Sequence, residues 1–340
     1  MAGPSPGIVG IGASVPNHRL TNRDLERMVE TSDEWIIQRT GIKERRILGE
    51  DEDPTVLGVE AAEGALVAAG LALEEIDLVI TAANVQLMPV PGSSALILEG
   101  LRRRASSSSR SDSTRGKEIP FFDLVAGCTG FIYALEVARR MFHGGHRHIL
   151  VIGLEALSRF TNWKERETCV LFGDGAGAVV LGPVGEGRGI LASYLAADCS
   201  KWALLRVEAG GTKLPADPET ISSGQHFLKM EGRGVFEEAV RMMERASLLA
   251  LERAGLKKEE VDWFVPHQAN LRIIKAFAKR LRIPWAKILV NIERYGNTST
   301  ASIPLALDEA VKDNRLREGD LVVLTGFGAG VTYGANVIRW

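Results

Sequence analysis

The residue with the clearest chemical potential is Cys128, in the segment FFDLVAGCTGFIYAL (121–135). An apolar strand, a turn of small residues and a helix opened by Cys128 are expected there. A thiol at a helix N-terminus lies at the positive end of the dipole, which lowers its pKa and favours thiolate. Unpaired N–H groups at such a helix start can also bind an oxyanion. Cys169 and Cys199 have no such setting, and we interpret them as structural thiols.

A histidine and an asparagine farther along the chain could complete a site with this thiol. Nucleophilic thiols usually work with histidine, and His267 follows an apolar, strand-like stretch at Trp263–Val265. Strand ends are where α/β folds place their sites. Asn297 lies in a Gly-Asn-Thr turn before a helical segment. The histidines of HGGHRH (143–148) lack nearby carboxylate or cysteine partners, so we predict no metal site.

Cys128, His267 and Asn297, in this chain order, fit two mechanisms. In a papain-like hydrolase, Asn297 would orient His267, which would activate Cys128. In a condensing enzyme, Cys128 would hold an acyl group as a thioester. His267 and Asn297 would then donate hydrogen bonds to a malonyl thioester, which loses CO2 and attacks that acyl group. The flanking CGSCW-type signature of papain-like enzymes is absent. A non-catalytic acyl-CoA or carrier-protein binding module is a third alternative, against which the intact residue set argues.

Composition indicates the kind of protein that must position these residues. The 340 residues leave room for about two domains. A net charge of −2 argues against nucleic-acid binding. Apolar residues make up 45% and charged residues 25%, which is typical of globular proteins. We find no signal peptide and no apolar run of about 18 residues, so we expect a cytoplasmic chain that binds no membrane.

The elements around the candidate residues occur twice. ALVAAGLALEEIDLVI (65–80) aligns without gaps with ALERAGLKKEEVDWFV (250–265), and half of the positions are identical. A second helix and strand at 134–153 resemble those at 306–326. Apolar strands that alternate with helices indicate an α/β fold. The two ordered matches therefore predict a duplicated α/β chain.

The duplication predicts a division into two similar halves, 1–182 and 183–340. If the halves pack about a pseudo-twofold axis, the helix start at Cys128 and the turn at Asn297 lie close together. One segment, RRRASSSSRSDSTRGK, does not fit either half. It is polar and of low complexity, so we predict a flexible surface insertion at 101–117.

Five motifs together resemble the β-ketoacyl-ACP synthase III (3-oxoacyl-ACP synthase 3) family, thiolase-like condensing enzymes that start bacterial type II fatty acid synthesis. They are AGCTGF at Cys128, VPHQANLRII at His267, YGNTS at Asn297, FGDGAGA (172–178) and TSDEWIIQRTGI (31–42). The resemblance runs over nearly the whole chain. It implies the thiolase fold, a duplicated αβαβα sandwich of five layers, which usually forms a homodimer.

The resemblance also implies roles for individual residues. Cys128 would be acylated by an acyl-CoA primer, and His267 with Asn297 would promote decarboxylation of malonyl-ACP. The amides of Cys128 and Ala329 would form the oxyanion hole, and Phe327 would line the malonyl site. Acyl-CoA and malonyl-ACP are substrates of this acyltransferase family, so no cofactor and no metal are implied.

Binding residues follow from the same motifs. Trp35 and Arg166 would sandwich the adenine of coenzyme A, and Arg39 would lie near its phosphates. The acyl carrier protein would contact a segment that contains Gln268, Ala269, Asn270, Leu271 and Arg272. Arg272 also opens a basic stripe on a helical segment, which has the members Arg272, Lys275, Lys279 and Arg282. An acidic partner would suit that stripe.

Four features depart from the family pattern: the insertion, Asn84–Ser93, Ala197–Leu205 and Glu237. Glu237 stands where a basic residue is common, which predicts weaker carrier binding. The two segments lie where the family shapes its acyl tunnel. The sequence therefore does not decide whether the primer carries an acetyl, a branched or a longer acyl group. A related condensing enzyme of secondary metabolism would keep the same three catalytic residues.

Overall fold

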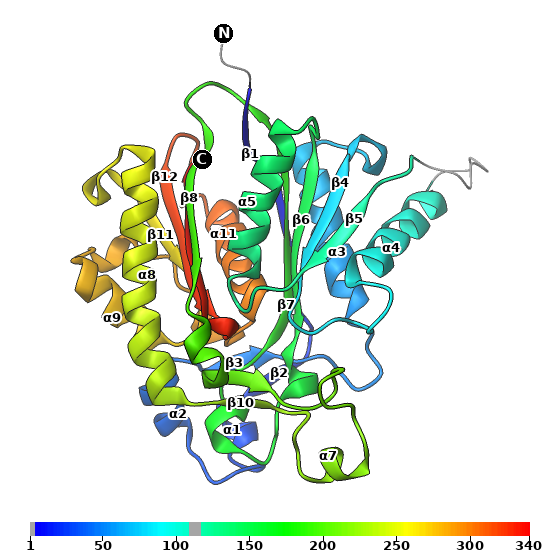
Figure 1. The fold of residues 1–340 in the computed structure, drawn as a ribbon, viewed down its shortest axis with the longest axis vertical. Coiled ribbons are helices and arrows are strands. Elements are labelled where there is room, and N and C mark those ends of the chain that lie inside the picture. The colour runs from blue at the N-terminus through cyan, green and yellow to red at the C-terminus, as the bar shows by residue number, and fades with distance from the viewer. Residues whose placement is uncertain (1–3, 109–116) are drawn as a thin grey trace.

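Two β-sheets of matching topology form the body of the chain (Figure 1). The computed structural model describes residues 4–108 and 117–340. The first sheet has the order β1-β7-β6-β4-β5 and the second the order β8-β13-β12-β11. In the first sheet β4 runs parallel to β6, and in the second β11 runs parallel to β12. The antiparallel strands β7 and β13 occupy equivalent positions in the two sheets.

The bounds of the strands place each sheet in one part of the sequence. The first sheet contains β1 (Ser5–Ser14), β4 (Leu78–Ala82), β5 (Phe121–Leu124), β6 (Ile149–Ala156) and β7 (Asp174–Val184). The second contains β8 (Gly189–Ala197), β11 (Trp263–Pro266), β12 (Leu321–Gly328) and β13 (Thr332–Arg339). Residue 182 thus lies near the end of β7. The division into two domains at that residue stays a prediction.

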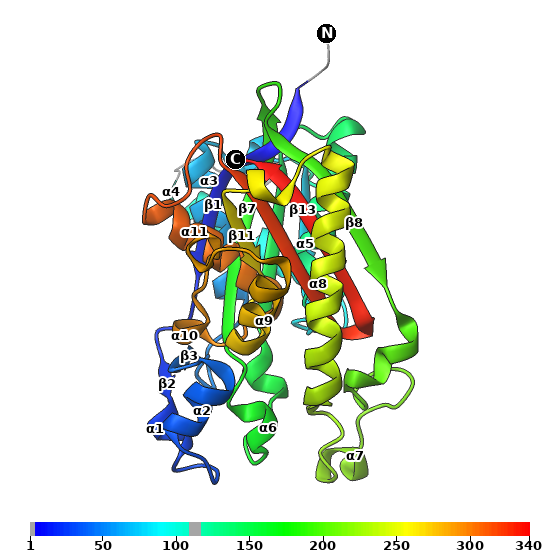
Figure 2. The ribbon, with the colours of Figure 1, turned by 90° about the vertical axis from the view of Figure 1, so that its left-hand side faces the viewer.

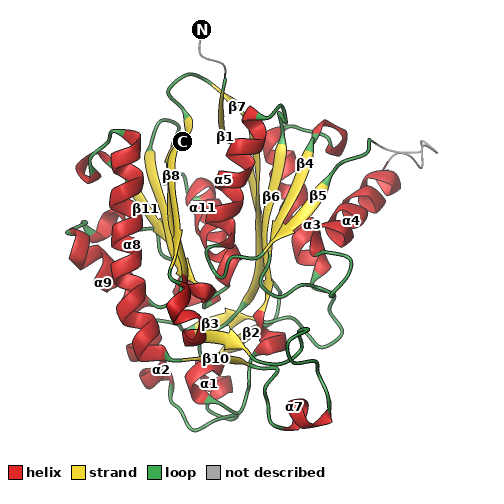
Figure 3. Ribbon diagram, in the orientation of Figure 1, coloured by secondary structure: helices red, strands yellow, loops and turns green. Residues whose placement is uncertain are grey.

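Helices fill the space between the sheets and cover their outer faces (Figures 1 and 3). The inner layer consists of α5 (Gly130–His143) and α11 (Ser302–Lys312). The outer layers consist of α3 (Thr55–Ala69) with α4 (Ser93–Ser108), and α8 (Gly232–Ala254) with α9 (Leu271–Leu281). One apolar core joins the inner helices to both sheets, with Phe131 and Leu307 fully buried in it. This is the five-layered sandwich that the family resemblance implies.

The repeated sequence motifs occupy equivalent places in the two halves. Gly70 ends α3 and Gly255 ends α8, with φ angles of 66° and 70° that favour glycine. Asp77 accepts hydrogen bonds from the backbone N–H groups of Arg147 and His148, which lie just before β6. Asp262 accepts one from the backbone of Leu321, at the start of β12. The predicted duplication is confirmed.

The prediction of a flexible insertion at 101–117 is wrong for its first part. Helix α4 continues through Ser108, and residues 109–116 lie outside the described part of the chain. Arg103 pairs with Glu99 one turn earlier at 2.8 Å. Arg104 pairs with Glu63 of α3 at 2.7 Å. The composition suggested a loop because it does not reveal partners on a neighbouring helix.

Short elements gather at one end of the sandwich (Figure 2). They are β2 (Arg19–Thr21), α1 (Asn22–Leu25), α2 (Asp33–Thr40), β3 (Glu44–Arg46), α6 (Arg166–Cys169), β9 (Leu205–Val207), α7 (Pro218–Ser222), β10 (Leu228–Met230) and α10 (Ile292–Tyr295). Arg45, fully buried, donates hydrogen bonds to the carbonyls of Leu20 and Val170. This arginine ties β3 to β2 and to the segment that follows α6. Among the described residues, no helix combines the length and apolar character needed to cross a membrane.

Candidate active site

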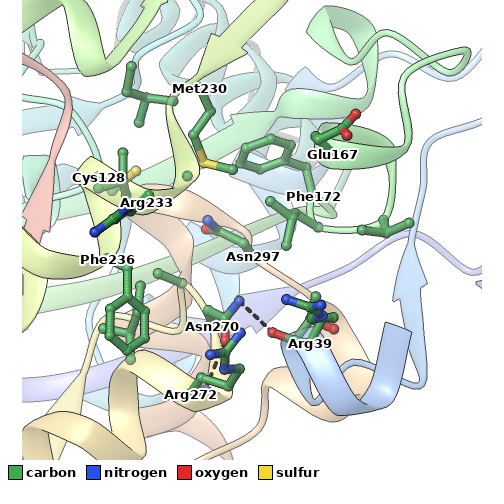
Figure 4. Close-up of a pocket in the computed structure, with 18 of the residues that line it drawn as sticks. Arg39, Cys128, Glu167, Phe172, Met230, Arg233, Phe236, Asn270, Arg272 and Asn297 are labelled. Atoms are coloured by element: carbon green, nitrogen blue, oxygen red, sulfur yellow. Dashed lines mark hydrogen bonds between the residues drawn. The ribbon is translucent and has the colours of Figure 1, made fainter. Parts of the chain in front are cut away.

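Cys128, His267 and Asn297 line one cavity of about 500 Å³. Figure 4 shows Cys128 and Asn297 in its wall. The cavity lies where the short elements meet the sandwich. Its wall also includes Trp35, Arg39, Glu167, Phe172, Leu205, Met230, Arg233, Phe236, Glu237, Ala269, Asn270, Arg272 and Phe327. The duplication alone predicted that the helix start at Cys128 and the turn at Asn297 would meet. The structure brings both together with His267.

The backbone around Cys128 is held by two close approaches of glycine. A Cβ atom on Gly127 would lie 2.4 Å from the backbone nitrogen of Ala329, and Gly127 has a φ of 60°. A Cβ atom on Gly328 would lie 2.2 Å from the backbone nitrogen of Cys128. Only glycine allows the two segments to pack this closely. The amides of Cys128 and Ala329 thus lie near one another, as an oxyanion hole would require.

The charge state of Cys128 differs from the sequence expectation. Helix α5 begins at Gly130, so the thiol lies two residues before the helix rather than on its first residue. Burial raises the pKa of the Cys128 thiol to about 12, with a smaller contribution in the same direction from Glu155. A hydrogen bond from Ser299 acts in the opposite direction. The prediction of a lowered pKa is therefore wrong, because desolvation outweighs the helix dipole.

His267 follows β11 and is held from two sides. Its backbone N–H donates to the carbonyl of Thr325 at 2.8 Å, and its Nδ1 lies 2.7 Å from Oγ of Ser302. The ring is 1% exposed, and burial lowers the pKa of His267 to about 3. The imidazole is therefore neutral at physiological pH. When the Ser302 hydroxyl donates to Nδ1, the ring proton lies on Nε2, which can then donate to a ligand.

Asn297 lies in a turn that the segment before β7 holds in place. Its N–H donates to the carbonyl of Leu171 at 2.8 Å, and its own carbonyl accepts from Gly173 at 3.0 Å. The side-chain Oδ1 accepts from the backbone N–H of Ser299 at 2.9 Å. Since this bond engages the oxygen, the NH2 group is the part of the amide left to bind a ligand.

These contacts separate the two mechanisms that the sequence leaves open. A papain-like site needs the asparagine oxygen on the histidine. Here Nδ1 of His267 contacts Ser302, and Oδ1 of Asn297 contacts Ser299. The histidine and the asparagine instead offer two neutral N–H donors to the same cavity. Such a pair can stabilise negative charge that develops on a carbonyl oxygen.

An aromatic residue with two arginines stands at the mouth of the cavity. The guanidinium of Arg166 lies 4.7 Å, and that of Arg39 5.8 Å, from the centre of the Trp35 ring. Arg166 does not line the cavity itself, and it covers the ring face that an adenine would need. An adenine sandwiched as the resemblance implies would have to displace it. Asn270 donates to the carbonyl of Arg39 at 3.1 Å, which links α9 to α2 (Figure 4).

The segment predicted to contact a carrier protein divides into a buried and an accessible part. Gln268 is 1% exposed, and its side chain bonds the backbone of Pro266, Leu289 and Asn291. The prediction is wrong for this side chain, which supports the loop and does not reach the surface. Ala269 is buried too, whereas Asn270 and Leu271 are half-buried and Arg272 is exposed. Arg272 stacks over Phe236 with 5.7 Å to the ring centre.

Sequence reasoning missed several residues of the site. Ser299 and Ser302 belong to the same motif as Asn297, and their hydroxyls could have been considered as hydrogen-bond partners. Phe172, Met230 and other apolar wall residues come from separate segments, and no local pattern marks them. Among the described residues, no group of three or more His, Cys, Asp or Glu side chains could hold a metal ion.

Comparisons with known proteins identify the family of the chain. Two models of the 3-oxoacyl-[acyl-carrier-protein (ACP)] synthase III family match residues 122–199 and, for its C-terminal part, 251–340. A β-ketoacyl-[acyl-carrier-protein] synthase III of Roseiflexus castenholzii is 48% identical over 334 residues, which covers 98% of this chain and 97% of that protein. The chain belongs to the β-ketoacyl-ACP synthase III family.

Solved structures place the fold in the same family. The synthase III of Aquifex aeolicus superimposes with a TM-score of 0.87 at 43% identity, covering 99% of this chain and all of that one. A priming β-ketosynthase of the R1128 polyketide pathway gives a TM-score of 0.88 at 33% identity, covering 99% and 96%. The thiolase-like fold implied by the sequence motifs is thus confirmed. The chain is similar to synthase III enzymes from end to end.

Proposed function

We propose that the chain catalyses the condensation of an acyl-CoA primer with malonyl-ACP, which gives a 3-oxoacyl-ACP, CoA and CO2 and starts type II fatty acid synthesis. The observation that carries the proposal is the cavity in which Cys128 meets two neutral donors, His267 and Asn297. The oxygen of Asn297 bonds to Ser299, and Nδ1 of His267 contacts Ser302. Asn297 therefore does not orient His267 as a general base for hydrolysis. The chemistry is assigned to the chain and the two substrates, without a cofactor or a metal.

In the first step, the thiol of Cys128 attacks the carbonyl carbon of acyl-CoA. A new C–S bond forms to the enzyme, the C–S bond to CoA breaks, and the thiol proton leaves on the sulfur of CoA. The exchange is neutral overall, so the raised pKa of Cys128 is compatible with it. Negative charge exists only on the tetrahedral intermediate, where the amides of Cys128 and Ala329 would bind the oxygen.

In the second step, malonyl-ACP replaces CoA in the cavity. Nε2–H of His267 and the NH2 group of Asn297 would donate to the thioester oxygen while the C–C bond to the carboxylate breaks and CO2 leaves. The enolate then attacks the acyl carbon on Cys128, whose sulfur leaves and takes up one proton. Phe327 lies 5.9 Å from the ring centre of His267 and would help to exclude water.

The mouth of the cavity would receive the two large substrates. Trp35, Arg39 and Arg166 would bind coenzyme A after Arg166 moves off the indole ring. The exposed basic stripe of α9, led by Arg272, would attract an acidic carrier protein. Glu237, which also lines the mouth, reduces the positive charge there.

A homodimer in the cytoplasm is part of the proposal. Strand β5 pairs with β4 and forms an edge of the first sheet. Large apolar side chains are exposed along this edge and in the segment before α4: Met88, Val90, Phe121, Phe122 and Val125. Exposed apolar patches of this kind usually mark an interface. A second copy paired edge to edge would cover them and extend the sheet.

A priming ketosynthase of secondary metabolism is the second candidate. The similarity to the R1128 enzyme favours it, because that protein belongs to a polyketide pathway. The two candidates differ in the primer and in the carrier protein that they accept, while the three catalytic residues are the same.

The first experiment is intact-mass analysis of the protein after mixing with a panel of acyl-CoAs, beside Cys128→Ala. We expect a mass gain of one acyl group that is absent from the variant, followed by CO2 release and loss of the adduct when malonyl-ACP is added. The acyl group that accumulates identifies the preferred primer. A stable adduct that malonyl-ACP never removes would contradict the proposal and favour a binding module, and steady hydrolysis of acyl-CoA would favour a hydrolase.

A further inference from the structure

A buried carboxyl group next to the candidate active site has no role in the reaction described above. Glu155 lies on β6, is 0% exposed, and acts on Cys128 through its charge. Isolated carboxylates are rarely buried completely unless partners satisfy them. Its position joins the two halves, because β6 belongs to the first and its partners Ser299 and Thr300 to the second.

The hydrogen bonds of Glu155 all involve one of its two carboxyl oxygens. Its Oε1 accepts from the backbone N–H of Asn84 at 3.1 Å and from the side-chain amide of Asn84 at 2.6 Å. It also contacts the hydroxyls of Ser299 at 3.1 Å and Thr300 at 3.2 Å. Its Oε2 is buried without a hydrogen-bond partner among the described residues. All of these contacts fall on Oε1 and none on Oε2, and the Thr300 hydroxyl also bonds the carbonyl of Ala82 at 3.0 Å. Such an asymmetry fits the carbonyl and hydroxyl oxygens of a neutral acid.

Asp174 provides the contrast within the same sheet. It is also 0% exposed, yet Oδ1 accepts from the backbone of Ser158, and Oδ2 accepts from the backbone of Leu48 and the hydroxyl of Ser158. Donors on both oxygens are what a buried carboxylate anion needs. The arrangement at Glu155 is therefore not a general feature of buried carboxyl groups in this chain.

Ser299 connects Glu155 to the reacting groups. Its backbone N–H holds Oδ1 of Asn297 at 2.9 Å, and its hydroxyl contacts Glu155 at 3.1 Å. The same side chain lowers the pKa of the Cys128 thiol. The hydroxyl also accepts from the side-chain amide of Asn84 at 2.9 Å. A hydroxyl has one proton to donate. That proton can go to an ionised Glu155 or to a thiolate at Cys128, but not to both. Ser299 has a φ of 49°, unusual for a residue other than glycine and common at functional sites.

We propose that Glu155 is a positioning residue that controls the reactivity of Cys128 through Ser299. When Glu155 is neutral, the Ser299 hydroxyl is free to stabilise a thiolate. When Glu155 is ionised, it takes that hydroxyl and adds a negative charge beside the sulfur, which disfavours the thiolate. The proposal uses Cys128 as the nucleophile of the proposed function, but its test needs neither acyl-CoA nor a carrier protein.

The titration of Glu155 falls in a useful range. Burial raises its pKa to about 7, against the effect of its four hydrogen bonds. The charge of Glu155 acts on Cys128, a titratable group in the segment before α5. Asn84, Ser299 and Thr300, which contact the carboxyl group from two other segments, carry no charge, and neither does Gly175, opposite on β7. Asp174 lies one position farther along β7 and bonds to Leu48 and Ser158 instead.

The experiment follows alkylation of Cys128 by iodoacetamide over a range of pH, with the adduct counted by intact mass and located by peptide mapping. In the wild type, the rate should rise less steeply than the hydroxide concentration near pH 7, where Glu155 ionises. In Glu155→Gln, which mimics the neutral acid, the rate should rise in direct proportion to hydroxide. At pH 8 this variant should react about tenfold faster, which corresponds to about one unit of thiol pKa. Identical profiles for the two proteins would overturn the proposal.

Two further variants test the route and the specificity. Ser299→Ala should slow alkylation, and adding Glu155→Gln to it should restore less than the gain seen in the wild-type background. Fully additive effects would contradict the role of Ser299. Asp174→Asn is the matched control, and its profile should follow that of the wild type. If Glu155→Gln does not fold, the wild-type profile decides, because a rate strictly proportional to hydroxide through pH 7 would refute the proposal.

Discussion

The neutral state of His267 predicts how decarboxylation depends on pH. An ordinary histidine with a pKa of about 6.5 is about 97% protonated at pH 5, so a reaction that needs its neutral form would fall about 30-fold from pH 7.5. Burial lowers the pKa of His267 to about 3, so only about 1% is protonated at pH 5. If the neutral ring donates a hydrogen bond to the malonyl thioester, the rate of CO2 release should change less than twofold over this range.

The assay measures initial CO2 release from malonyl-ACP by Cys128→Ala, which lacks the titrating thiol. A second sample carries Glu155→Gln as well, because Glu155 has a pKa of about 7. A tenfold or larger loss with a midpoint near pH 6.5, in both samples, would refute the reasoning. Folding must be followed by circular dichroism, since the unfolded chain binds a proton at His267 below about pH 6.5 and the folded chain does not. Stability therefore falls as pH falls, by about 2 kcal/mol at pH 5.

Ser302→Ala is the matched variant for this prediction. It removes the hydroxyl that contacts Nδ1 at 2.7 Å and leaves the ring buried. Burial is the cause of the lowered pKa of His267, so the pH profile should stay flat. The rate itself should fall about fivefold, the effect of losing one hydrogen bond of about 1 kcal/mol that holds the ring in its reactive form. A profile that now falls below pH 6.5 would show that Ser302, rather than burial, sets the charge state.

Three further predictions concern the rest of the site. Gly328→Ala places a Cβ atom 2.2 Å from the nitrogen of Cys128, so acylation by acyl-CoA, read by intact mass, should slow at least about 100-fold, the effect of losing an oxyanion donor. Arg272→Glu should raise the KM for malonyl-ACP more than that for acyl-CoA, and Lys279→Glu, farther along α9, should do so less; equal effects on both substrates would contradict the docking assignment. Phe122→Glu on the β5 edge should halve the mass measured by light scattering, and an unchanged mass would exclude this edge as the interface.

Local sequence signals predicted those parts of the fold that depend on local physics. The repeats at 65–80 and 250–265 combine an apolar helix face with a glycine in a left-handed C-cap, and both motifs formed as expected. Strands also form at the ends of the repeated segments 134–153 and 306–326, but β6 and β12 continue past these segments to Ala156 and Gly328. Those extra residues pair with β7 and β13 and carry Glu155 and Phe327 into the site.

Errors arose where a distant segment decides the outcome. Residues 102–108 read as a loop because their polar composition gives no hint of the glutamates on α3 that pair with Arg104. Gln268 read as a surface contact because its motif is next to exposed residues, yet its side chain satisfies three backbone groups inside the loop. Neither case could be decided from the order of residues along one segment.

The thiol of Cys128 shows the same principle at the level of chemistry. A helix start was visible in the sequence and predicts a lowered pKa, but helix-dipole effects amount to about 1 kcal/mol, or less than one pKa unit. Burial in the folded chain raises the pKa of this thiol to about 12 and lowers that of His267 to about 3. As a result, neither the thiol nor the imidazole carries a charge at neutral pH before a substrate binds. Negative charge then develops only when a thioester reacts, at the positions where the amides, His267 and Asn297 can stabilise it.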